Sequence, residues 1–197
     1  MSAPTPRPHV ANIDFPTFYA PAFGNDDSQA RAFYKSLTET PARVVMHQAA
    51  RMVWLGDQID QVARGRPALQ ILFFMIAAEA VAKLADGFED EGQSRKYVRR
   101  FFLNICSDDH RARLAGALCG SVGWLSAEEV VDFLYDVRCD VAHRGKYFDL
   151  HLPRPELDEA ELVVNWREKT LFATITIGEL RRIVLEGTVL AAKGLNQ

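Results

Sequence analysis

The chain lacks the features of a metalloprotein, a nucleotide-binding protein or a disulfide-bonded protein. Of its 197 residues only three are cysteines, and no two of them form a Cys-x-x-Cys pair. Cys106, Cys119 and Cys139 lie in apolar or helical patterns, which is typical of reduced thiols in a cytoplasmic protein. The five histidines have no metal-ligand spacing, and no HExxH, Walker or dinucleotide motif occurs. The sequence therefore predicts no disulfide, no metal site and no cofactor.

Excess positive charge and long apolar runs are also missing. The net charge is -3 and the pI is about 6.0, which argues against a surface that coats nucleic acid. Any contact with RNA must come from a local basic patch. The longest apolar run, 71–78, is far shorter than the roughly 18 residues of a membrane span. The N-terminal region has no apolar core of a signal peptide. We therefore expect a cytoplasmic protein without a membrane segment.

Composition and hydrophobic spacing predict a mainly α protein. Hydrophobic residues make up 48% of the chain, enough for a sizeable core at this length. Five prolines within residues 1–27 predict an extended N-terminal arm. The remaining residues, 28–197, are expected to form a single domain whose core, 40–148, is an antiparallel helical bundle. Helices are predicted at about 28–38, 40–64, 67–86, 94–105, 108–119 and 127–144.

Beyond the bundle the hydrophobic period changes from helical to alternating. This pattern predicts a small C-terminal β-hairpin over 161–166 and 171–177. Thr176 and Glu179 form a capping box that opens a final helix, to about residue 193. Hairpin and helix together occupy 160–194, and the hairpin is expected to be an appendage.

The most informative segment is 134–148, Leu-Tyr-Asp-Val-Arg-Cys-Asp-Val-Ala-His-Arg-Gly-Lys-Tyr-Phe. A Ser-x-x-Glu capping box at 126–129 and Gly145 predict the two ends of a helix over 127–144. Arg138 and His143 lie near its end. Positions five apart on a helix point roughly 140° away from each other, so these side chains do not share a face. A second copy of the helix could bring Arg138 of one protomer near His143 of the other, in a symmetric dimer.

Arginine and histidine suit the cleavage of RNA without a metal. The ribose 2′-OH attacks the adjacent phosphate, which needs a proton acceptor, a proton donor and positive charge on the phosphorane. Imidazole serves as acid and base near neutral pH, and guanidinium binds two phosphate oxygens. The helix dipole favours the protonated form of His143, which suits a general acid.

The Arg-x4-His motif, preceded by Tyr135 and followed by Arg144-Gly145, resembles the signature of the HEPN superfamily. The resemblance covers roughly 40–148. It implies an HEPN-like bundle and a metal-independent endoribonuclease whose Arg138 and His143 are shared across a homodimer. Many family members belong to toxin-antitoxin, phage-defence or RNA-processing systems, so RNA and a protein such as an antitoxin are the implied partners. Tyr135, Cys139 and Asp140 surround the pair as supporting residues.

A lone glutamate in the apolar segment 67–86 also looks like an early HEPN helix. The resemblance implies that Glu79 orients Arg138. The alternative is an i,i+4 ion pair with Lys83, and both interpretations stay open. Arg138 could equally pair with Asp136 or Asp140.

Two groups of basic residues are candidates for binding RNA. Arg144 and Lys146 follow the motif. Arg95, Lys96, Arg99 and Arg100 form a second group, although compensation by the acidic turn at 86–91 is the favoured explanation of their charge.

Two functions are compatible with these observations. One is the endoribonuclease, and the other is a catalytically inactive HEPN-fold module that binds RNA or protein. Family members usually carry a polar residue directly after the arginine, whereas this chain has Cys139. A Cys139–His143 nucleophile is disfavoured because no third orienting residue accompanies it.

Overall fold

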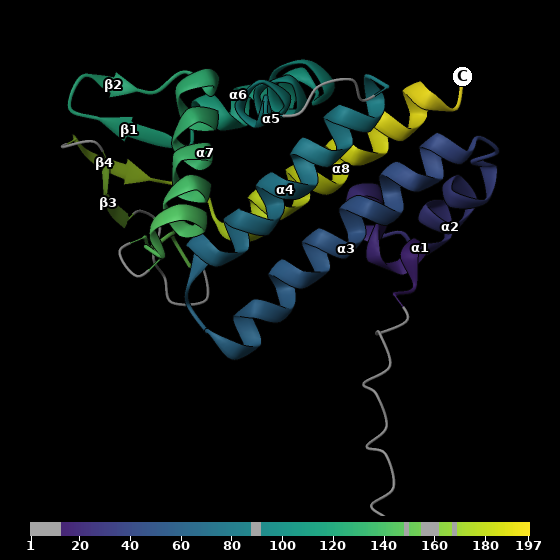
Figure 1. The fold of residues 1–197 in the computed structure, drawn as a ribbon, viewed down its shortest axis with the longest axis horizontal. Helices are drawn as coiled ribbons and strands as arrows, with labels where there is room; N and C mark the ends of the chain where they lie inside the picture. The colour runs from purple at the N-terminus through teal and green to yellow at the C-terminus, as the bar shows by residue number, and fades with distance from the viewer. Residues whose placement is uncertain (1–12, 88–91, 148–149, 155–161, 167–168) are drawn as a thin grey trace, which may run out of the picture.

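The computed structural model describes residues 13–87, 92–147, 150–154, 162–166 and 169–197. Figure 1 shows a mainly helical fold with a small antiparallel sheet at one end, so the predicted fold class is confirmed at this level. The helices of the described residues are α1 (Phe15–Phe18), η1 (Ala20–Phe23), α2 (Asp27–Ser36), α3 (Thr40–Val62), α4 (Pro67–Ala85), α5 (Ser94–Arg100), η2 (Phe101–Ile105), α6 (Asp108–Ala115), α7 (Ala127–Arg144) and α8 (Ile177–Leu195).

Three long helices form the body of the bundle. α3 and α4 are antiparallel neighbours, as predicted, and α8 packs on both of them (Figure 1). α8 runs in the same direction as α4. α7 packs on α4, and the short α5 packs between these two helices. One hydrophobic cluster of buried residues extends through all of these elements, from Tyr19 to Ala192.

The apolar character of α4 follows from its position among its neighbours. Ile71, Phe74, Met75, Ala78 and Val81 are fully buried, and they point to more than one side of the helix. Among the described residues α4 is the one helix long and apolar enough to cross a membrane, by length and composition alone. Half of that span is buried inside the fold. The packing of α4 against α3, α7 and α8 explains its apolar sequence as that of a core helix.

A turn of π-helix, η2, packs unusually closely against α8. A Cβ added at Gly187 would lie 2.6 Å from Phe101 Cζ and 2.7 Å from Cys106 Sγ. Both of these side chains are buried. Burial also raises the pKa of the Cys106 thiol, which therefore stays protonated. All three cysteines are free, as the sequence predicted.

We expect Gly187→Ala to lower the free energy of unfolding by about 1–3 kcal/mol, because buried aromatic and sulfur atoms must move to admit one methyl group. Gly194→Ala, on the same helix with nothing within 4 Å of the added Cβ, serves as the control and should stabilise by about 0.5 kcal/mol. Urea titration of both variants measures the difference. Equal stabilities would contradict the close packing of α8 on η2.

The helix expected over 108–119 is shorter than predicted. α6 ends at Ala115, and the following residues form β1 (Leu118–Gly120) and β2 (Gly123–Trp124). Gly116 caps the helix, and Gly123 has a φ of 118°, a value that L side chains rarely adopt. These glycines turn the chain back on itself, so that a second hairpin replaces the last helical turn.

The predicted C-terminal hairpin exists, as β3 (Leu162–Trp166) and β4 (Lys169–Ala173). It ends earlier than the expected residue 177, because α8 already begins at Ile177. The hairpin is also not an appendage. β4 pairs with β1, which gives a sheet in the order β2-β1-β4-β3.

A polar network fixes the sheet to the bundle. Arg113 on α6 donates to both carboxylate oxygens of Glu179 on α8, at 2.8 and 3.0 Å, and to the carbonyl oxygen of Thr174. Glu179 also completes the predicted capping box with Thr176. Burial raises the pKa of Glu179, but the hydrogen bonds from Arg113 and Thr176 outweigh it, and the pKa lies below its usual value.

The N-terminal arm differs from the expected extended segment. Residues 15–23 form α1 and η1, while residues 1–12 lie outside the described part of the chain. The apolar side chains between the prolines explain the difference, since they are drawn to the bundle. Tyr19 is 1% exposed and donates to the carbonyl of Met46, and the Phe15 ring stacks on His47 at 3.9 Å between centroids.

His47 should make this contact dependent on pH. Its ring nitrogen lies 2.5 Å from the Tyr34 hydroxyl. Burial, and then the charges of Arg51 and Arg43, lower the pKa of His47 from its ordinary 6.5. As the pH falls, the unfolded chain is therefore protonated at His47 before the folded protein is. The stabilisation that neutral His47 gives is fully present above the ordinary pKa and is lost as the pH falls through the lowered pKa of the folded protein.

We expect His47→Gln to reduce the difference in unfolding free energy between about pH 7.5 and 5.5, because an amide keeps a contact with Tyr34 but does not titrate. The exposed His151 gives the control variant, His151→Gln. Denaturant unfolding at both pH values is the measurement. The same pH dependence in the wild type and the His47 variant would rule out a role of this histidine.

Candidate active site

Helix α7 has both of its predicted ends. Ser126 and Glu129 form the capping box, and Gly145 takes the left-handed conformation with a φ of 63°. The backbone N–H groups of Gly145 and Lys146 donate to the carbonyls of Val141 and Asp140, which closes the helix immediately after the motif. The last turn is thus a defined structural feature that carries His143 at a fixed position.

Arg138 contacts a carboxylate of the core helix α4. Its side chain is 19% exposed, and its Nη2 lies 3.8 Å from Oε2 of Glu79. Glu79, 12% exposed, also binds Lys83 Nζ at 2.8 Å and the Ser94 hydroxyl at 2.7 Å, both through Oε1. The two interpretations of Glu79 therefore hold together: the i,i+4 pair with Lys83 exists, and the same carboxylate lies against Arg138.

Tyr135 and Cys139 lie beside this arginine on α7. The guanidinium of Arg138 is 5.6 Å from the centre of the Tyr135 ring, and that of Arg95 is 4.7 Å from it. Burial raises the pKa of Tyr135, as does its hydrogen bond with Cys139, while Arg138 opposes the shift. The phenol therefore stays protonated at neutral pH. Cys139 directly follows Arg138, at the position where members of the HEPN superfamily usually carry a polar residue.

His143 lies apart from this group, on the exposed last turn of α7. His143, Arg144 and Lys146 are all exposed. Asp140 pairs with Arg144, 3.1 Å from its Nη1. Within the described part of the chain, no hydrogen bond or ion pair joins His143 to Arg138. One protomer thus holds the arginine against α4 and presents the histidine to solvent, in agreement with their predicted divergence on the helix.

The basic group on α5 is compensated by a row of acidic residues on α7. Arg99 makes a bidentate contact with Asp132, at 2.9 and 2.5 Å, and a further one with Glu128 at 2.8 Å. Arg95 reaches Asp136 at 2.5 Å and Asp132 at 3.4 Å. The favoured explanation, a compensated surface, therefore agrees with these ion pairs, and α7 supplies carboxylates that the prediction did not name.

The acidic turn at 86–91 is described only in part. Asp86 pairs with Arg100, and residues 88–91 lie outside the described residues. Lys96 is exposed, with its ammonium 5.8 Å from the Tyr97 ring centre. The i,i+4 spacing of Glu128, Asp132 and Asp136 was the signal in the sequence, because it sets three carboxylates on one face of α7.

In the ranges that the structure describes, no group of three or more His, Cys, Asp or Glu side chains is placed to hold a metal ion. No protein-family model, no curated protein and no solved structure matches this chain significantly. The residues of the site are therefore the basis for its chemistry.

We expect Asp132→Asn to remove one of the two carboxylates that pair with each of Arg95 and Arg99, which keep Asp136 and Glu128 as partners. The variant should lose about 1 kcal/mol of stability, because these ion pairs are partly exposed and screened, and should bind a single-stranded oligoribonucleotide a few-fold more tightly. Asp109→Asn makes the same charge change at an exposed residue without an ion pair in the described structure. Filter binding at several salt concentrations compares the two variants. Equal affinities would show that the acidic row does not limit the basic surface.

Proposed function

We propose that the protein is a metal-independent endoribonuclease of the HEPN type, with its site shared across a homodimer. The observation that carries this proposal is the contact of Arg138 with Glu79, combined with the exposed position of His143 on the same helix. A phosphate-binding arginine must be held in a fixed orientation, and the partly buried carboxylate of Glu79 lies where it can hold Arg138.

Arg138 stabilises the charge that develops on the scissile phosphate. Its Nη2 lies 3.8 Å from Glu79, which is longer than a direct hydrogen bond, and the same carboxylate is shared with Lys83 and Ser94. The guanidinium therefore keeps donors for two phosphate oxygens. Glu79 acts as a positioning residue, because it touches Arg138 and not the substrate.

His143 moves the protons. It removes the proton of the ribose 2′-OH and donates one to the leaving 5′-oxygen, in the manner of a general acid and base. It lies exposed on the last turn of α7, where an RNA strand can reach it. Arg144 and Lys146, exposed beside it, attract the RNA backbone.

The two groups act on one phosphate only if two protomers meet. A two-fold axis near the end of α7 sets Arg138 of one protomer near His143 of the other, and the exposed Ala142 lies where the helices would approach. A toxin-antitoxin or phage-defence setting in the cytoplasm, with an antitoxin as protein partner, belongs to this proposal.

Purified protein should cleave single-stranded RNA in the presence of EDTA, because the acid-base chemistry of the pair uses no metal. The products should end in 2′,3′-cyclic phosphate. His143→Ala should abolish cleavage, and Arg138→Ala should reduce the rate by about 100-fold or more. Gel analysis with mass spectrometry of the product ends is the measurement.

Arg51→Ala serves as the control, since this exposed arginine lies outside α7, and it should retain full cleavage. If wild type, Arg138→Ala and His143→Ala are equally inactive on a broad set of RNAs, the catalytic proposal fails.

The dimer should sediment at twice the chain mass at micromolar concentration. Its interface should bury on the order of 800 Å² per protomer. Ala142→Glu should dissociate it, because a charge would be buried at the two-fold axis. Val62→Glu introduces the same charge on α3, at a residue 86% exposed, and should leave the dimer intact. A wild-type monomer would remove the composite site.

One observation favours an inactive module that binds RNA or protein. The Cys139 thiol is engaged with Tyr135, so the position after the motif arginine offers a weak hydrogen-bonding group in place of a polar side chain. Such a protein would still bind RNA in EDTA but would not cleave it. The Arg138 and His143 variants distinguish the two functions.

A further inference from the structure

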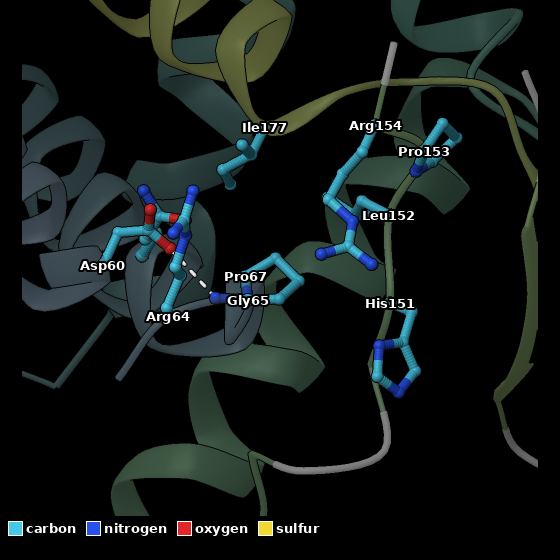
Figure 2. Close-up of a pocket in the computed structure, with 10 residues that line it drawn as sticks. Asp60, Arg64, Gly65, Pro67, His151, Leu152, Pro153, Arg154 and Ile177 are labelled. Atoms are coloured by element: carbon cyan, nitrogen blue, oxygen red, sulfur yellow. Dashed lines mark hydrogen bonds between the residues drawn. The ribbon is translucent and has the colours of Figure 1, made fainter. Parts of the chain in front are cut away.

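A polar pocket lies at the end of the bundle where α3 turns into α4. Its volume is about 360 Å³, at the lower end of the range for small-molecule sites. Figure 2 shows Asp60 and Arg64 on one side of it and the segment from His151 to Arg154 on the other. The walls also include the apolar side chains of Pro67, Leu152, Pro153 and Ile177.

The charge of this pocket is mainly positive. Arg64, His151 and Arg154 line it, against one carboxylate, Asp60. The guanidinium of Arg154 points toward the turn, where its Nη1 would lie 3.6 Å from a Cβ at Gly65. Asp60 accepts the backbone N–H of Gly65 at 3.1 Å, which holds this turn in place. Arg64 and Arg154 border the pocket from opposite sides (Figure 2), and guanidinium groups are suited to a dianionic phosphate.

Gln70 is the second and independent observation. It lines the pocket and is only 9% exposed. Among the described residues its side-chain amide has no hydrogen-bond partner. Buried amides in folded proteins are almost always hydrogen-bonded, so an unpaired one at the wall of a pocket indicates a ligand with a polar group at that depth.

The geometry points to a binding site for a sugar phosphate, with the phosphate between Arg64 and Arg154 and the sugar hydroxyls on Gln70. An amide both donates and accepts, as a hydroxyl does, and the free carboxylate oxygen of Asp60 accepts from a second hydroxyl. The apolar walls pack against the carbon skeleton of the sugar. This ligand chemistry occurs in a free pentose phosphate and in the phosphorylated 5′-end of RNA.

The site is independent of the proposed ribonuclease, because none of its residues belongs to α7. Isothermal titration of the full chain with ribose 5-phosphate, inorganic phosphate and ribose tests it. Ribose 5-phosphate should bind at least about tenfold more tightly than inorganic phosphate, and ribose alone should give no heat at about 1 mM. A 5′-phosphorylated tetraribonucleotide should bind more tightly than ribose 5-phosphate if the natural ligand is the 5′-end of RNA. It should bind more weakly if the natural ligand is a free pentose phosphate.

Three variants assign the contacts. Gln70→Leu should lose the preference for ribose 5-phosphate while keeping the affinity for inorganic phosphate, and it should fold normally because the amide has no partner to lose. Arg64→Gln, at an exposed position, should weaken both ligands. Arg51→Gln, an exposed arginine outside the pocket, should change neither.

The site is overturned if neither phosphate-bearing probe gives heat at about 1 mM, or if Arg64→Gln binds as Arg51→Gln does. A preference for ribose 5-phosphate that survives in Gln70→Leu would overturn the role of Gln70.

Discussion

The arrangement of this protein depends on one partly buried carboxylate. α4 is the apolar centre of the bundle, and Glu79 is its sole acidic residue. A carboxylate that is 12% exposed needs partners, since an unpaired buried charge is strongly destabilising. Three groups supply them: Lys83 from its own helix, Ser94 from α5 and Arg138 from α7. The need to pair one charge thus brings three helices together and sets the height of Arg138 on α4.

The acidic face of α7 completes this arrangement and limits it. Asp132 and Asp136 bind Arg95 and Arg99 of α5, so α5 helps to fix the orientation of α7 on α4, and these two arginines are compensated. At the end of α7, His143 and Lys146 are exposed. Under our proposal, binding and proton transfer are therefore concentrated on one helical turn, and a protein with a net charge of -3 needs no broad basic surface.

Much of this structure could be predicted from local signals. The ends of α7 and the start of α8 were predicted correctly, because capping boxes at Ser126 and Thr176 act through neighbours in the sequence. The β1–β2 hairpin and the helical turns around Tyr19 were missed, because they depend on pairing with β4 and on burial against α3. In the site, the positions of Arg138 and His143 on the helix were predictable. The partners of the arginines on α5 were not, since they come from a different helix.

The central claim is that Arg138 and His143 act across two protomers, and a mixed dimer tests it most directly. Arg138→Ala and His143→Ala proteins, each inactive alone, are combined so that their subunits exchange. If the site is shared, each mixed dimer contains one intact Arg-His pair, and about a quarter of the wild-type cleavage rate should return. If both residues act within one protomer, every protomer lacks one of them, and the mixture stays inactive, which would contradict the account.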